Sequence, residues 1–148
     1  MKNSIKQLIM QIELVIASKF KATAPICKIS TSEQTTQVTC GEEINNINLD
    51  LDTATNDEIK IEFLNKDDQD DNVIIIKKIK MDGIDLQHFI YQGEFRPVYN
   101  QDWFDKQQPK PPLVYRPCTE LRHSGVWSIR VSQPIWKMIM NEWIKDDR

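Results

Sequence analysis

The sequence predicts an all-β protein, a jelly-roll-like antiparallel β-sandwich followed by a loop-rich C-terminal extension that ends in an α-helix. Two observations predict the sandwich: short runs in the first 86 residues alternate apolar and polar side chains, and turn-forming clusters separate these runs. A third observation, the aromatic and proline-rich character of the rest, predicts the extension. We therefore expect a sandwich at residues 1–86 and an extension at residues 87–148, packed on the same domain.

The strands of the sandwich follow from this alternation. In residues 8–20 (LIMQIELVIASKF) it favours a strand from about residue 10, although the first part is also compatible with a helix. Proline in Ala24-Pro25 interrupts the run, and Met81-Asp82-Gly83 is a turn that ends the series. The expected strands cover residues 10–20, 26–30, 34–39, 44–51, 59–63 and 73–81.

The extension contains few regular elements. Residues 87–133 are irregular, and the string Pro109-Lys110-Pro111-Pro112 should be extended, because proline fits neither a helix interior nor a central strand. Residues 126–131 (VWSIRV) predict one more strand. Pro134 begins the predicted terminal helix, with Ser132 as its cap, and this helix has a broad apolar face.

Composition and charge limit the function classes. The chain has 148 residues, of which 40% are hydrophobic, and this is enough for a packed core without disulfide bonds or structural metal ions. The net charge of −3 and the pI of about 5.4 argue against a nucleic-acid partner. No run is long and apolar enough to span a bilayer, so no membrane partner is expected. Cys27, Cys40 and Cys118 are interpreted as reduced thiols, with a Cys27–Cys40 disulfide as the alternative.

An acidic loop lies between the last two expected strands of the sandwich. It carries Asp67, Asp68, Asp70 and Asp71 within five residues. Carboxylate and carbonyl oxygens are the ligands that Ca²⁺ takes, so the loop is a candidate calcium site, with Asn65 and loop carbonyls able to complete the shell. The alternative is a solvated polar turn that needs no ion. The loop lacks the glycine and closing glutamate of an EF-hand.

Aromatic residues of the extension are candidates for binding a partner. Three readings stay open for them: a cover over the edge of the core, a protein interface, or a glycan site. The terminal helix adds two tryptophans seven residues apart, which suit either a subunit contact or packing on the sandwich. The candidate partner-binding residues are Phe95, Tyr99, Trp103, Phe104, Trp136 and Trp143.

No catalytic motif is present, and the chain is expected not to be an enzyme. His88 and His123 lack metal-ligand spacing, and the five-residue separation of Cys118 from His123 is weak support for a thiol nucleophile. A hydrolase with Asp-bound Mg²⁺ is disfavoured, because the carboxylates cluster in one loop without a base elsewhere.

Residues 11–86 resemble the small calcium-dependent xylan-binding carbohydrate-binding modules. The matching pieces are IELVIAS, APICKI, INNINLDL, IKIEFLN, DNVI and the Met81-Asp82-Gly83 turn. This resemblance implies a sandwich fold, and it implies calcium ligands at Asp67 or Asp68 and at Asp71. The loop is shorter than in that family, and the family's ligand-binding loop and the arginine of its Asp-Arg-Asn motif have no counterpart here.

The extension resembles small structural proteins of tailed bacteriophages in its overall sequence style. The segments that carry this resemblance are GEFRPVY, the proline string and GVWSIRVSQPIW. This second resemblance implies a non-enzymatic virion protein, either a capsid decoration or a tail or neck component. It would be made in the host cytoplasm and would dock on other virion proteins and on copies of itself through the extension. The alternative function is a calcium-dependent carbohydrate-binding module that recognises a host surface glycan.

Overall fold

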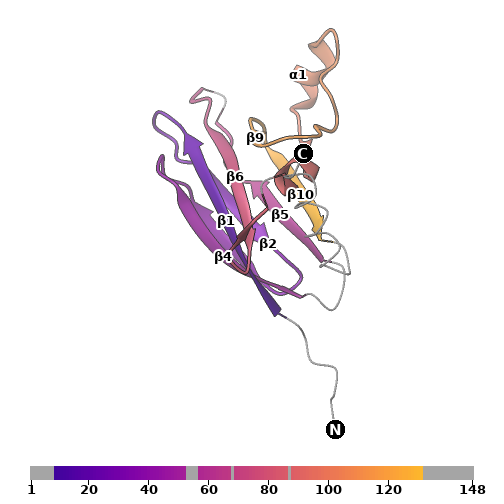
Figure 1. Ribbon diagram of the computed structural model, residues 1–148. Coiled ribbons are helices and arrows are strands. Elements are labelled where there is room, and N and C mark those ends of the chain that lie inside the picture. The colour runs from indigo at the N-terminus through magenta and orange to yellow at the C-terminus, as the bar shows by residue number, and fades with distance from the viewer. Residues whose placement is uncertain (1–8, 53–56, 68, 87, 132–148) are drawn as a thin grey trace.

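The computed structural model describes residues 9–52, 57–67, 69–86 and 88–131. Figure 1 shows two antiparallel β-sheets that face each other, with the hydrophobic core between them. This confirms the predicted all-β sandwich. The predicted terminal helix from Pro134 lies outside the described residues.

The first sheet has β1 at its centre. Residues of β1 pair with β4 on one side and with β6 on the other, and the register with β6 shifts between Val15 and Ile16. The strands are β4 (Asn45–Asp52), β1 (Ile9–Lys19), β6 (Val73–Met81) and β7 (Ile84–Asp85) in that order, and β9 (Glu120–Leu121) pairs with β6. The turn between β6 and β7 has positive φ at Asp82 and Gly83, as the Asp-Gly pair predicts.

The second sheet draws on both halves of the chain. Its strands in order are β3 (Thr35–Thr39), β2 (Ile26–Ser30), β5 (Asp57–Phe63), β10 (Gly125–Val131) and β8 (Glu94–Pro97). The strands β8, β9 and β10 all follow residue 87, so the described part of the extension completes both sheets. Pro97 is tolerated because β8 is an edge strand.

The core is built from the alternating side chains of both sheets. Ile59, Ile61 and Phe63 on β5 are buried, as the period of two predicts. Trp127 on β10 is fully buried, and its indole N–H donates to the carbonyl of Cys118 at 2.8 Å. A side chain at Gly93 would meet the Trp127 ring, because an added Cβ would lie 2.3 Å from it.

The cysteines are free thiols. Cys27 and Cys40 are both buried, and their sulfurs lie 3.7 Å apart. The hydrogen bond to Cys40, together with burial, raises the pKa of the Cys27 thiol. Reduced thiols were the main expectation for this pair, and the structure confirms it.

Two short helices interrupt the segment after residue 87. A 3₁₀ turn, η1 (Phe89–Gln92), places Phe89 and Ile90 in the core. Helix α1 (Gln101–Lys106) follows β8 and stands clear of the sandwich at one end (Figure 1). Asn100 caps α1, since its side chain accepts a hydrogen bond from the backbone N–H of Trp103 at 3.1 Å. Within the described segments, neither helix has the length and apolarity needed to cross a membrane.

Candidate functional site

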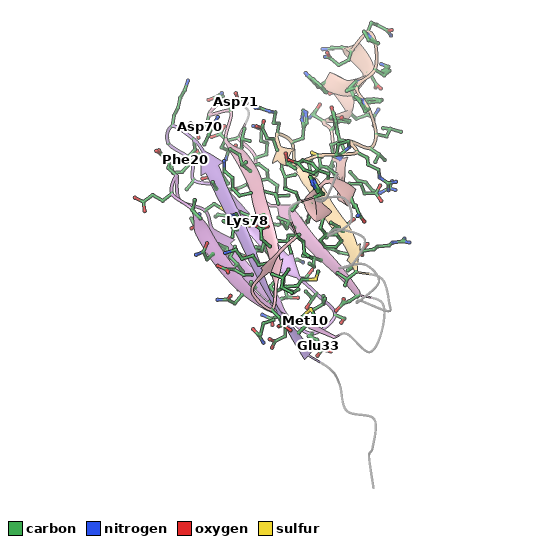
Figure 2. The ribbon with its side chains drawn as sticks, in the orientation of Figure 1. Met10, Phe20, Glu33, Asp70, Asp71 and Lys78 are labelled. Atoms are coloured by element: carbon green, nitrogen blue, oxygen red, sulfur yellow. The ribbon has the colours of Figure 1, made fainter. Side chains whose placement is uncertain are left out.

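Two connections between the sheets meet at one end of the sandwich. The segment 20–25 joins β1 to β2, and the acidic loop, residues 64–72, joins β5 to β6. Figure 2 shows Asp70, Asp71 and Phe20 together at this end, with Met10 at the opposite end. The expected loop therefore packs against a segment more than 40 residues away in the sequence.

Asp70 is the centre of this packing. One oxygen of its carboxylate accepts the backbone N–H groups of Lys21 and Ala22 at 2.9 and 3.0 Å, and the other accepts that of Thr23 at 2.9 Å. Burial alone would raise the pKa of Asp70, but these hydrogen bonds outweigh it and lower the pKa below its ordinary value. Asp70 thus closes the turn after β1.

Asn72 ties the two segments together. It is fully buried, its side-chain oxygen accepts the N–H of Asp67 at 2.9 Å, and its amide nitrogen donates to the carbonyls of Thr23 at 3.1 Å and Asn65 at 3.2 Å. Asn65 adds a bond from its amide to the carbonyl of Ala24 at 3.0 Å. These amides satisfy backbone groups that the sheets leave unpaired.

The other described carboxylates of the loop, Asp67 and Asp71, have different partners. Asp67 accepts the N–H of Gln69 at 3.0 Å and the hydroxyl of Thr23 at 2.9 Å. The side chain of Asp71 is 78% exposed and lies 3.5 Å from the ammonium of Lys66. Asp68 lies outside the described residues.

Three of the predicted partner-binding aromatics form a cluster next to this loop. Tyr99 packs against Trp103 and Phe104, with ring centroids 5.6 and 5.4 Å apart. His123 meets the edge of Tyr99 at 5.1 Å and lies 6.1 Å from Trp103. Burial, followed by the contact with the Tyr115 hydroxyl, raises the pKa of Tyr99, so its hydroxyl stays protonated at any physiological pH.

The acidic loop and the aromatic cluster line one open cavity of about 570 Å³. Its walls combine two aromatic rings with a majority of hydrogen-bonding and charged side chains. The lining residues are Lys66, Asp71, Val98, Tyr99, Asn100, Trp103, Arg122, His123 and Ser124. Trp103 is 43% exposed, so part of its ring is open to a ligand. We refer to this cavity as the loop–aromatic pocket.

The structure separates the remaining predicted residues. Phe95 is 1% exposed and lies in the core near Tyr115, so its ring is not available to a partner, because β8 turns it inward. Trp136 and Trp143 lie outside the described residues. Lys66 and Asn100 were not singled out as pocket residues from the sequence, although the position of Asn100 before QDWFDK is a capping signal that identifies α1.

The described carboxylates do not form an open oxygen cage. Asp67 and Asp70 point their oxygens at N–H and hydroxyl donors, and Asp71 faces an ammonium. Among the residues that the structure describes, no three acidic, histidine or cysteine side chains converge as a metal site would require. A calcium ion, which takes carboxylate, carbonyl and water oxygens, would have to compete with these partners for the carboxylates.

Comparisons with known proteins give the fold. No protein-family model matches the chain, and no curated protein matches it. Two solved structures are similar: the selenomethionine form of vCBM60, described with calcium-dependent carbohydrate-binding modules, and vCBM60 in complex with galactobiose. Each has a TM-score of 0.53 and 13% identity; they cover 81% and 80% of this chain, and 89% and 96% of the vCBM60 chains. The chain has the sandwich fold seen in these carbohydrate-binding modules.

Proposed function

We propose that this protein is a glycan-binding module and that the loop–aromatic pocket is its binding site. The observation that carries the proposal is the juxtaposition, in one open cavity, of exposed aromatic surface with charged and amide side chains. This reading corresponds to the alternative function expected from the sequence.

The chemistry of a sugar fits the two sides of the pocket. A pyranose ring has an apolar C–H face that packs on an aromatic ring, and Trp103 offers such a ring at 43% exposure. Sugar hydroxyls both donate and accept hydrogen bonds, and the pocket presents an exposed acceptor at Asp71 and an exposed donor at Arg122. Neighbouring Tyr99 holds Trp103 in place through ring packing.

The structural neighbours support the same class of ligand. One of the vCBM60 structures is a complex with galactobiose, and the fold likeness makes an oligosaccharide the first class to test here. Fold alone does not assign a ligand, since unrelated functions share sandwich folds. The geometry of the pocket in this chain is therefore what the experiment must address.

The test is affinity electrophoresis of the purified chain in gels containing soluble galactan or xylan, followed by titration with the oligosaccharide of whichever polymer retards it. Substitution Trp103→Ala should weaken binding about tenfold or more, because it removes the exposed ring, and a factor of ten corresponds to about 1.4 kcal/mol. The matched control is Tyr91→Ala, which removes an aromatic ring that is 52% exposed and lies outside the pocket.

Retardation by a polymer with loss in Trp103→Ala and none in Tyr91→Ala would support the proposal. If Tyr91→Ala abolishes binding and Trp103→Ala does not, the glycan binds near η1 and the assignment of the loop–aromatic pocket is wrong. If no polysaccharide retards the chain, the glycan-binding proposal fails. The fold likeness to vCBM60 does not test the virion role. The predictions of a virion location, of docking on virion proteins and of self-association therefore remain predictions. The expectation that the chain is not an enzyme also remains a prediction.

A further inference from the structure

The ammonium of Lys66 lies inside the acidic loop rather than in solvent. Its side chain is 7% exposed. The nitrogen donates to the backbone carbonyl of Asn72 at 2.8 Å and lies 3.5 Å from a carboxylate oxygen of Asp71. A lysine so deeply covered is rare unless its charge is paired, so these oxygen contacts must account for its position.

The partners of Lys66 are the types of oxygen that a calcium ion takes. A carbonyl and a carboxylate are both common calcium ligands. Here they converge on a side-chain cation that belongs to the same loop. A metal ion placed beside these oxygens would face the positive charge of Lys66 at close range.

The neighbouring carboxylates are occupied by donors as well. Both oxygens of Asp70 accept backbone N–H groups from segment 20–25, and both oxygens of Asp67 accept hydrogen bonds. The positive ends of these N–H and O–H bonds compensate the carboxylate charge directly. Each described carboxylate of the loop thus has a protein donor or the Lys66 ammonium as its partner.

We propose that the ammonium of Lys66 is the built-in cation of the acidic loop and that the loop holds its conformation without calcium. The inference concerns the stability of the loop and stands whether or not the loop–aromatic pocket takes a glycan. It also bears on that pocket, because Lys66 and Asp71 line one of its walls. Under the proposed function, glycan binding would then be independent of calcium.

The first experiment is thermal unfolding of the full chain in about 5 mM CaCl₂ and in about 5 mM EGTA. The midpoints should agree within about 1 °C, because a ligand raises stability only if it binds the folded state. Calcium bound at a hundred times its dissociation constant would instead raise the midpoint by about 5–10 °C for a chain of this size. A rise of that size in the unsubstituted chain would overturn the proposal.

The second experiment replaces the cation. Lys66→Met keeps an unbranched apolar stem, lacks only the terminal atom and removes the charge, and it should lower the midpoint by about 3–6 °C in both buffers. The matched control, Lys77→Met on β6, changes an exposed lysine and should shift the midpoint by less than about 2 °C. Equal effects of the two substitutions would also overturn the proposal.

Two further measurements keep the outcome decisive. If Lys66→Met does not fold, Lys66→Arg retains a positive charge and should keep most of the stability, whereas a loss as large as that of Lys66→Met would contradict a role for the charge. Glycan retardation in EGTA tests the consequence for binding separately. Absence of retardation in both buffers would count against the proposed function, while the melting comparison would still decide the role of Lys66.

Discussion

Replacement of Asn72 by leucine tests whether hydrogen bonds alone hold the acidic loop. The side chain makes three bonds, at 2.9, 3.1 and 3.2 Å, to backbone groups of Asp67, Thr23 and Asn65. Leucine has the same branching and the same number of side-chain heavy atoms as asparagine and makes none of these bonds, so the substitution removes them while keeping the shape of the side chain. The affected backbone groups are then left without their partner.

The expected loss follows from the number of bonds. A net contribution of about 1 kcal/mol for each gives about 3 kcal/mol for Asn72→Leu, and more where water cannot reach the groups left behind. With an m-value of about 2 kcal/mol per molar urea, the midpoint of urea unfolding should fall by about 1.5 M at unchanged m. The thermal midpoint should fall by about 6–12 °C.

The control for this prediction is Asn48→Leu on β4. Asn48 is exposed, and its substitution should change stability by no more than about 0.5 kcal/mol. A fall of less than about 0.5 M urea for Asn72→Leu, or a fall equal to that of the control, would refute the view that this amide fastens the loop to segment 20–25.

Three further predictions address stability and the thiols. Gly93→Ala should destabilise the fold by about 1–3 kcal/mol in urea unfolding, because the added Cβ would lie 2.3 Å from the buried Trp127 ring; an unchanged midpoint would contradict this packing. The pKa of Asp70 is lowered in the folded state, so its contribution is complete above its unfolded pKa of about 3.9 and is lost as the pH falls through the folded value. Stability should thus decline below about pH 4, and Asp70→Asn should flatten this decline; equal slopes would count against the prediction. Buried Cys27 and Cys40 should react with a thiol reagent only after unfolding, and rapid labelling of either in the native protein would show that the core is open there.

The strands with one buried face were accessible from the sequence because a period of two is a local signal. Residues 73–81 coincide with β6, and the predicted strand at residues 59–63 lies within β5. Strand β8 was missed because it has only four residues and ends at a proline, and both features predict a loop. Proline is compatible with β8 because this strand lies at the edge of its sheet, which the sequence alone does not show. Helix α1 was missed although Asn100 marks its start.

The composition of the candidate site could not be predicted from the sequence, for a different reason. The sequence identified the acidic loop and the aromatic residues as separate features, 67–71 and 95–104, and nothing local indicates that they line one cavity. The roles of Asp70 and Lys66 depend on partners brought close by folding: Asp70 binds a segment 47 to 49 residues away. Only the topology of the two sheets shows that the Asp70 carboxylate lies beside segment 20–25 and closes the turn after β1.

The topology also explains why the polar wall of the loop–aromatic pocket is fixed in advance of any ligand. Strands β1 and β6 belong to one sheet and β2 and β5 to the other, so segment 20–25 and the acidic loop both cross between sheets at the same end. Asp70 and Asn72 join these crossings, and Lys66 is held by the carbonyl of Asn72. A ligand that met Lys66 and Asp71 would therefore find their backbone already ordered, which lowers the entropic cost of binding. Calcium serves this ordering role in many loops, whereas here the protein's own amides and one ammonium are in position to do so.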